Sequence, residues 1–370
     1  MFLRTKAVPR VAVLLALAAL ASCSSIGAPT RGHLVIVGGG LRSDNAEVYA
    51  AFTEGGKASY VVLPTASGVP EESGPAAVAT ISRYAAPGSR VEVVELLEST
   101  PERAEATDTV RAIRAADAVW FTGGVQSRVT AVFRPGALDT RAYRAVKHVL
   151  DGDGRVGGSS AGAAIMSDPM IRGGSSREAL LDGVTEDGFG LEQGMGFFGF
   201  GIVDQHFLSR GRIGRLLVAL DETETRYGFG IADDRALAVD LRARRATAIG
   251  ERAVVFVDAR DMRREGRSLL GARLSLCSSG DVVDLRDGAV ARADGKRPVA
   301  PIDVLEGRHY DDLRPFAANA LALLLERLST DPTRAQSATE DGVTLTVRAD
   351  ERTTFHAFDD TLAGLRCSTP

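Results

Sequence analysis

The chain has 370 residues, a net formal charge of −4 and 25% charged residues, a composition typical of a globular protein with one large domain or two modest ones. It contains no basic tract and no cluster of aromatic residues for stacking on bases, which argues against a nucleic-acid partner. It also contains no Cys-x-x-Cys pair and no His/Cys cluster, so we expect neither a metal site nor a cofactor.

The first segment resembles the secretory signal of a bacterial lipoprotein. Basic residues in 1–10 precede an apolar run over 11–20, and Leu20-Ala-Ser-Cys23 follows, in the order that a signal requires. Ten apolar residues are too few to span a bilayer. We therefore expect a signal peptide over 1–22, a lipid on Cys23 and a linker over 23–31. An ordinary cleaved signal with an incidental cysteine is the alternative.

This interpretation places the mature protein outside the cytoplasm. It predicts an exported protein held to the cell envelope through its lipid, at the outer membrane or the periplasmic face, or an extracellular one. The membrane would then be one partner of the protein.

From residue 32 onward, strand-like and helix-like segments alternate. Apolar strands are predicted at 33–37, 59–63, 90–96 and 118–121, and helices at 46–53, 76–85, 107–116 and 142–150. This repeat predicts an α/β fold with a doubly wound, mostly parallel sheet, in which ligands bind beyond the carboxyl ends of the strands. The triple glycine at 38–40 lacks the third glycine of a dinucleotide motif, so we expect a tight turn on the rim of the site.

Residues 155–166 form the central motif of the chain. A short strand leads into Gly158-Ser-Ser-Ala-Gly162, which satisfies the pattern G-x-S-x-G of a nucleophile elbow with Ser160 as the nucleophile. At such a corner the serine hydroxyl is exposed at the sheet edge, and the first N–H groups of the following helix can stabilise an oxyanion. A glycine-rich turn that only packs closely, or that binds a phosphate, is the alternative.

Two further segments place polar groups at the same predicted edge. Thr122-Gly-Gly-Val-Gln126 closes the strand at 118–121; its glycines let backbone N–H groups approach a reacting carbonyl, and Gln126 can bind a substrate amide or carboxylate. The strand near 202 runs into Asp204-Gln-His206 and then a predicted helix with Arg210 and Arg215. Imidazole suits a serine nucleophile as general base, and arginine can grip a carboxylate with two hydrogen bonds.

Together these motifs resemble the cyanophycinases and the related aspartyl dipeptidases. The resemblance covers about residues 32–258 and rests on four segments: Gly-Ser-Ser-Ala-Gly-Ala at 158–163, Phe-Thr-Gly-Gly-x-Gln at 121–126, Asp-Gln-His-Phe at 204–207 and Gly-Ile-Ala-Asp-Asp-Arg-Ala-Leu at 230–237. It implies a class I glutamine-amidotransferase-like fold with serine in place of cysteine. It also implies a serine peptidase that hydrolyses Asp-containing bonds, as when cyanophycin is cleaved to β-Asp-Arg dipeptides, and a substrate peptide or polyamide rich in Asp and Arg.

The resemblance also assigns roles to residues. Ser160 is the expected nucleophile, His206 the base, and Gly124 and Ala161 the oxyanion donors. The expected substrate pocket consists of Gly123, Gln126, Asp204, Gln205, Arg210 and Arg215.

Two departures from the family pattern affect this assignment. Val125 stands where many members carry Asp, which removes a polar group from the pocket. Where many members read Gly-Ile-Asp-Glu, this chain has Gly-Ile-Ala-Asp233. The acid that orients His206 is thus either Glu178 or Asp233, and we favour Glu178.

The segment over 259–370 is an extension of unknown role outside the resemblance. It suggests strands within 273–287, a helix over 310–328 and a strand over 342–347. Cys277 and Cys367 either form a disulfide that fixes the C-terminus or stay separate buried thiols. A homodimer is left open. So are two alternative functions: an aspartyl dipeptidase, and a catalytically silent peptide-binding lipoprotein on the same fold.

Overall fold

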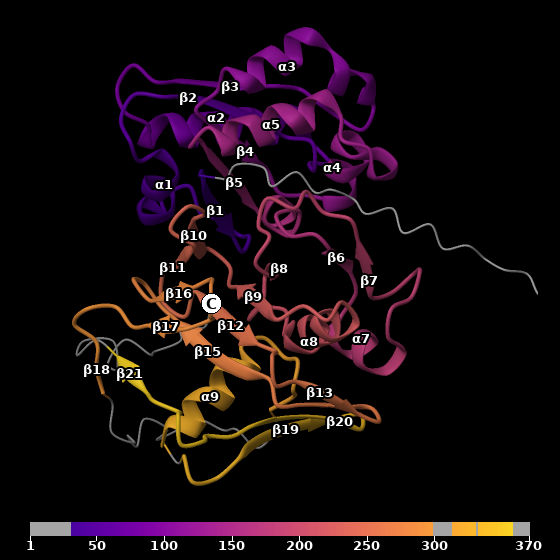
Figure 1. Ribbon diagram of the computed structural model, residues 1–370, viewed down its shortest axis with the longest axis vertical. Coiled ribbons are helices and arrows are strands. Elements are labelled where there is room, and N and C mark those ends of the chain that lie inside the picture. The colour runs from indigo at the N-terminus through magenta and orange to yellow at the C-terminus, as the bar shows by residue number, and fades with distance from the viewer. Residues whose placement is uncertain (1–30, 299–312, 331, 358–370) are drawn as a thin grey trace, which may run out of the picture.

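A nine-stranded sheet forms the centre of the molecule in the computed structural model, which describes residues 31–298, 313–330 and 332–357 (Figure 1). The strands lie in the order β17-β16-β11-β10-β1-β5-β4-β2-β3. From β1 to β3 the pairs are parallel, whereas β10, β11, β16 and β17 add antiparallel pairs. The bounds are β1 His33–Val37, β2 Ser59–Leu63, β3 Arg90–Val93, β4 Ala118–Phe121, β5 Arg155–Ser159, β10 Ala236–Asp240, β11 Arg245–Ile249, β16 Val282–Asp284 and β17 Val290–Ala291.

Helices cover both faces of the parallel half. Val35 and Val37 pack in one buried cluster with residues of α1 (Ala46–Thr53) and α2 (Pro70–Tyr84). Leu34 and Ile36 point to the other face, into a cluster with residues of α3 (Thr107–Arg114) and α5 (Arg141–Asp151). Each fully buried aliphatic side chain contributes about 1.5–3 kcal/mol. The predicted doubly wound α/β class is therefore confirmed.

A second sheet has four strands, all of which come from residues 202–277. Its order is β15-β12-β9-β8, with β8 (Ile202–Asp204) parallel to β9 (Tyr227–Ile231) and β12 (Val254–Asp258) antiparallel to both β9 and β15 (Arg273–Cys277). The helix α8 (Ile213–Glu222) and β8 pack in one buried cluster. The remaining elements before β8 are η1 Pro101–Glu105, α4 Gln126–Phe133, η2 Pro135–Ala137, α6 Ala161–Ala164, β6 Met170–Gly173, α7 Ser176–Asp182 and β7 Gly190–Glu192.

Some element boundaries differ from those predicted. The helix α2 begins at Pro70 instead of residue 76, because proline suits the first helical turn, where its missing N–H costs nothing. The predicted helix over 310–328 is α9, Ala320–Thr330, and residues 310–312 lie outside the described part. Asn319, immediately before α9, has a positive φ of 60°, and its N–H donates to the carbonyl of Leu208 at 2.8 Å. The helix α9 therefore begins immediately after the hydrogen bond that joins Asn319 to Leu208.

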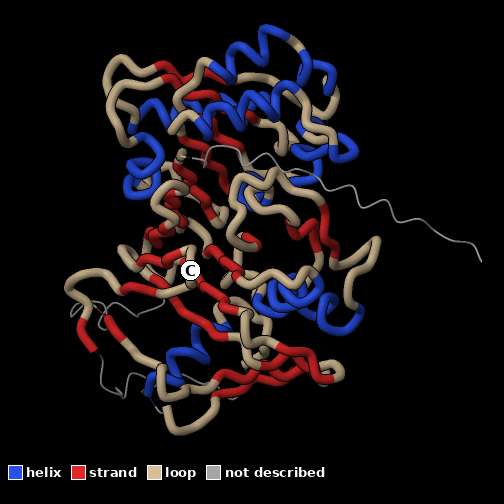
Figure 2. The backbone as a smooth tube through the Cα atoms, in the orientation of Figure 1, coloured by secondary structure: helices blue, strands red, loops and turns tan. Residues whose placement is uncertain are grey.

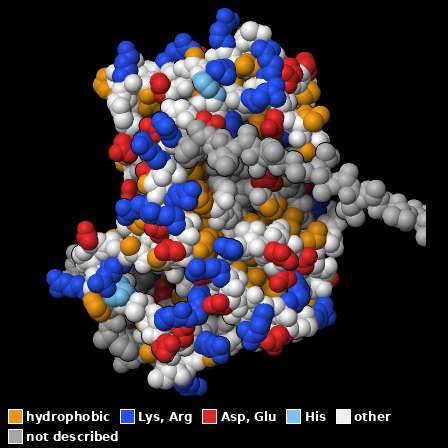
Figure 3. Space-filling model, viewed as in Figure 1, with side chains coloured by type: hydrophobic (Ala, Val, Ile, Leu, Met, Phe, Trp, Pro, Cys, Tyr) orange, Lys and Arg blue, Asp and Glu red, His pale blue; other side chains and the backbone are white. Residues whose placement is uncertain are grey.

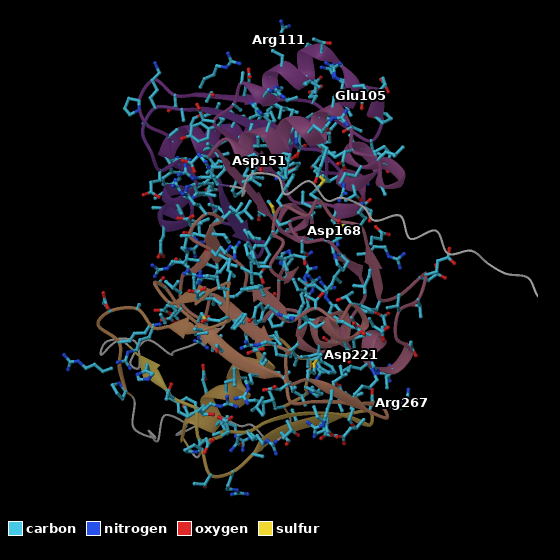
Figure 4. The ribbon with its side chains drawn as sticks, viewed as in Figure 1. Glu105, Arg111, Asp151, Asp168, Asp221 and Arg267 are labelled. Atoms are coloured by element: carbon cyan, nitrogen blue, oxygen red, sulfur yellow. The ribbon has the colours of Figure 1, made fainter. Side chains whose placement is uncertain are left out.

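Strands from beyond residue 258 extend both sheets, since β15 pairs with β12 and β16 pairs with β11. The β13–β14 hairpin (Arg263–Glu265 and Ser268–Leu270) lies beside α8, where Arg264 Nε donates to Asp221 Oδ2 at 2.7 Å; Figure 4 labels Asp221 and, on this hairpin, Arg267. The remaining elements are β18 Arg297–Pro298, β19 Gln336–Glu340, β20 Val343–Val347 and β21 His356–Ala357. Helices dominate the upper part of Figure 2, and strands dominate the part built by the C-terminal third.

Several sequence-based predictions fall outside the described residues. The signal peptide, Cys23 and Cys367 are among them, so the disulfide stays a prediction. Cys277 itself is buried, and burial raises the pKa of its thiol to about 12. Within the described ranges, no helix combines the length and apolar character needed to cross a membrane.

Candidate active site

Ser160 occupies a sharp corner between β5 and α6, with φ 57° and ψ −109°. A positive φ is costly for a residue with a side chain, and glycines make the corner feasible. A Cβ on Gly158 would lie 2.6 Å from the carbonyl oxygen of Gly162, and one on Gly162 would lie 2.4 Å from that of Phe121. The corner is the strand-to-helix geometry expected of a nucleophile elbow.

His206 lies directly beyond β8 and contacts this serine, with Nε2 2.9 Å from Ser160 Oγ. The triple-glycine turn supports the imidazole from the other side. The backbone N–H of His206 donates to the carbonyl of Gly38 at 2.6 Å. A Cβ on Gly39, whose φ is +111°, would lie 2.2 Å from the ring carbon Cε1. Only glycine lets the turn approach the imidazole this closely.

Asp233, two residues beyond the end of β9, is the carboxylate that contacts His206. Its Oδ1 lies against His206 Nδ1, and its Oδ2 accepts a hydrogen bond from Ser209 Oγ. Burial raises the pKa of Asp233, but the hydrogen bonds from His206 and Ser209, with the charges of His206 and Arg210, outweigh it and lower the pKa below its ordinary value. This aspartate is therefore held as an anion beside the imidazole.

Glu178, the acid favoured from the sequence, serves a different purpose, and that preference was wrong. It forms a capping box at the start of α7: its N–H donates to Ser175 Oγ at 3.1 Å, and its Oε2 accepts from the N–H of Ser175 at 2.6 Å. These hydrogen bonds lower the pKa of Glu178. The Ser-x-x-Glu pattern at 175–178 is itself the sequence signal for such a cap.

Of the two expected oxyanion donors, Ala161 follows Ser160 directly in the chain, and Gly124 follows Gly123, an expected pocket residue that approaches Ser160. A Cβ on Gly123 would lie 3.3 Å from the Cβ of Ser160. Gly124, with φ +144°, packs so closely against Ala66 that a Cβ would lie 1.9 Å from its carbonyl oxygen. Ala161 is the first residue of α6, where backbone N–H groups have no partner within the helix.

Two of the expected pocket residues form a buried ion pair instead, which corrects their assignment to substrate. The side chains of Asp204 and Arg215 are 0% and 2% exposed. Arg215 Nε donates to Asp204 Oδ2 at 2.8 Å, and its Nη1 donates to the carbonyl of Gly174 at 2.6 Å. An acid and an arginine that satisfy each other inside the protein are not available to a ligand.

The two glutamines also bond within the protein. The amide nitrogen of Gln126 donates to the carbonyls of Ile171 and Arg172, at 3.1 and 2.5 Å, which ties α4 to β6. Gln205 is buried. Its backbone carbonyl accepts from Arg212 Nη1 at 2.6 Å, and its side-chain oxygen lies 3.5 Å from Arg215 Nη2. The structure therefore corrects the expectation that Gln126 binds substrate, because its amide nitrogen is already bound within the protein.

Arg210 and Ser209 are the exposed members of the turn that follows His206. The charge of Arg210 contributes to the low pKa of Asp233. By contrast, burial lowers the pKa of the neighbouring Arg212 to about 10. The sequence did not single out Ser209, because a lone serine in a polar turn carries no signal until the fold sets it beside Asp233.

The comparisons with known proteins identify a peptidase family. The model of Peptidase family S51 matches residues 34–245, more than half of the chain. The chain belongs to Peptidase family S51. The resemblance to cyanophycinases and aspartyl dipeptidases, first carried by motifs, is thereby confirmed at the level of the family.

Two curated relatives agree with this membership. The chain is 30% identical to a cyanophycinase from Nostoc sp. over 235 residues, 61% of this chain and 74% of the relative. It is 31% identical to a cyanophycinase from Geminocystis herdmanii over 237 residues, 63% of this chain and 82% of the relative. Among solved structures, a peptidase from an acI-B1 Actinobacterium superposes with a TM-score of 0.49 and 17% identity, over 69% of this chain and 97% of that chain.

Proposed function

We propose that this protein is a serine peptidase of the cyanophycinase type, with Ser160, His206 and Asp233 as its triad. The observation that carries the proposal is the continuous contact from Ser160 Oγ to His206 Nε2, at 2.9 Å, and from His206 Nδ1 to Asp233. A nucleophile, a base and an orienting acid in this order are the arrangement of acyl-transfer enzymes.

In the proposed reaction, Ser160 Oγ attacks the carbonyl carbon of the scissile bond while its proton passes to His206 Nε2. The N–H groups of Gly124 and Ala161 stabilise the negative charge that develops on the carbonyl oxygen. The C–N bond then breaks, and His206 returns the proton to the leaving amine. Water, deprotonated by the same imidazole, releases the acyl group and restores Ser160.

The proposed substrates contain aspartate, with cyanophycin and its β-Asp-Arg dipeptides as the first candidates. Support comes from the curated relatives, which are cyanophycinases, and from the exposed Arg210 next to the triad. A guanidinium binds a carboxylate through two charge-assisted hydrogen bonds. With Asp204 and Arg215 satisfied internally, Arg210 is the arginine of this segment that we assign to the substrate carboxylate.

The test is to incubate the purified protein with cyanophycin and with a panel of α- and β-Asp dipeptides, and to identify the products by mass. We expect soluble β-Asp-Arg from the polymer and no product from Ser160→Ala. Ser159→Ala is the matched control and should keep activity, because Ser159 is the last residue of β5 and the hydroxyl that contacts His206 belongs to Ser160. Cleavage of dipeptides alone would make the protein an aspartyl dipeptidase, and no Ser160-dependent cleavage of any of these would contradict the proposal.

We also propose that the mature protein is anchored by lipid on Cys23 and acts outside the cytoplasm. The parallel pairing of β1 with β5 sets His33 opposite Arg155 and Val37 opposite Ser159. The chain thus enters the sheet at the edge opposite Ser160. Cys23→Ser should abolish processing and incorporation of labelled palmitate; a labelled mature form of that variant, or an unlabelled soluble mature form of the wild type, would contradict the anchor.

A further inference from the structure

Ser209 lies at the point where the proposed catalytic acid meets solvent. The side chain of Asp233 is 32% exposed, compared with 12% for His206. One carboxylate oxygen of Asp233 contacts the imidazole, and the other accepts from Ser209 Oγ. The same hydroxyl lies 3.2 Å from the carbonyl of His206, so Ser209 bridges the residues that carry the base and the acid.

We propose that Ser209 is a positioning residue of this peptidase, which fixes the plane of the Asp233 carboxylate and so holds His206 in its productive orientation. The proposal rests on the triad of the proposed function. Ser209 touches the acid and not the reacting atoms, so its effect on catalysis passes through Asp233.

The need for such a group follows from the acid itself. Rotation of a carboxylate about its last carbon–carbon bond is broad and weakly restrained. A single contact with His206 Nδ1 leaves that rotation open, and water competes for the exposed oxygen. A hydroxyl proton on Oδ2 removes this freedom and favours the anion.

The neighbouring backbone places the side chain of Ser209 where it can restrain the Asp233 carboxylate. The turn from 206 to 210 is closed by the N–H of Arg210, which donates to the carbonyl of His206 at 3.1 Å, and this brings residue 209 back over the acid. On the other side of Asp233 stands Gly40, where a Cβ would lie 3.1 Å from Oδ1. Gly40 has no side chain to restrain the carboxylate, so the restraint comes from Ser209.

The test compares Ser209→Ala with Ser209→Thr, using two measurements that need no knowledge of the substrate. The first is the rate at which a fluorophosphonate probe labels Ser160. The second is the low-field proton resonance of His206 Nδ1–H in NMR spectra, assigned by its loss in His206→Ala. We expect Ser209→Ala to slow labelling about five- to twentyfold and to shift the resonance, and Ser209→Thr, which keeps the hydroxyl, to restore both. With an active peptide, kcat should fall while KM changes less than twofold.

Ser279→Ala is the matched control, because Ser279 Oγ also donates to a carboxylate, that of Glu47 at 3.0 Å, and accepts from the N–H of Gly250 at 2.7 Å, and its hydrogen bonds involve no residue of the triad. Wild-type labelling and an unshifted resonance in Ser209→Ala would overturn the proposal. So would equal losses in the Ser209 and Ser279 variants, or no rescue by threonine in a folded protein. If no peptide is cleaved but Ser160 is labelled, the substrate assignment fails while the role of Ser209 is still measured.

Discussion

Two pairs of an aspartate and a basic residue, Asp204 with Arg215 and Asp233 with His206, have different roles in this protein. Asp204 pairs with Arg215 where neither side chain meets solvent. Asp233 contacts His206 beside Ser160, where both side chains are partly exposed. Asp204 and His206 are separated by one residue, yet one belongs to the interior and the other to the proposed catalytic centre.

Burial explains the difference. Removing a charge from water costs several kcal/mol of free energy, and a buried charge therefore needs an oppositely charged partner and hydrogen bonds that offset this cost. Arg215 meets this demand with Asp204 and the carbonyl of Gly174, so the pair fixes β8 against α8 and has nothing left for a substrate. Asp233 and His206 keep access to Ser160 and to solvent, which proton transfer requires.

The largest expected effect separates the two candidate acids. Asp233→Asn should lower kcat by ~10⁴, because the imidazole loses the carboxylate that sets its tautomer. Glu178→Gln, the matched change at the other carboxylate, should stay within about twofold of wild type, because Glu178 caps α7. Steady-state kinetics on an active Asp peptide checks both, and the reverse ranking would restore Glu178.

A large effect on stability is expected at the buried pair. Arg215→Ala should lower the free energy of unfolding by about 3–5 kcal/mol, because it removes both short hydrogen bonds to the buried Asp204 and leaves only the longer ion pair with Arg212, at 3.5 Å. The double variant Asp204→Leu with Arg215→Met should recover most of that loss. Urea denaturation measures both; a single variant as stable as wild type would mean that the pair is open to solvent.

A smaller effect, mainly on substrate binding, is expected at Arg210. Arg210→Gln should raise KM about tenfold or more for substrates with a free carboxylate, since a hydrogen bond to a charged group contributes about 1.5–3 kcal/mol. The free energy of unfolding of the Arg210→Gln variant should equal that of the wild type. Arg226→Gln, an exposed arginine next to the far end of β9, should alter neither quantity. Equal KM values for the two variants would remove Arg210 from the pocket.

The smallest effect concerns acid stability. The pKa of Asp233 is lowered from its ordinary value of 3.8, so the unfolded chain binds its proton more readily than the fold does. The stability contributed by the ionised group is present above about pH 4 and lost as the pH falls through the lowered pKa. Urea denaturation between about pH 3 and 6 should show wild type losing stability relative to Asp233→Asn only at the acid end. A constant difference would contradict the lowered pKa.

Figure 3 shows how charged side chains are distributed over one face of the molecule. On the visible face, acidic and basic side chains are interspersed, as a net charge of −4 in 370 residues allows. Composition could exclude a strongly basic surface, but it could not show which arginines are exposed. Arg210, Arg212 and Arg215 stand close together in the sequence, and only the first is exposed.

The sequence by itself determined the features that depend on neighbours along the chain. Apolar runs separated by helical patterns predicted the doubly wound sheet, because buried parallel strands need apolar residues on both faces. Gly158 and Gly162 marked the elbow, because only glycine fits the corner around Ser160. The position of His206 at a strand end made it the candidate base.

Only the tertiary structure decided which distant residues meet. Asp233 reaches His206 because β8 and β9 pair in parallel, with Asp204 opposite Gly230, and both residues leave the sheet at the same edge. Glu178 is nearer to Ser160 in sequence, yet its cap bond keeps it on α7. The strands β15 and β16 likewise join sheets that earlier segments began. Pairing and burial are properties of the assembled chain, and a local pattern carries neither.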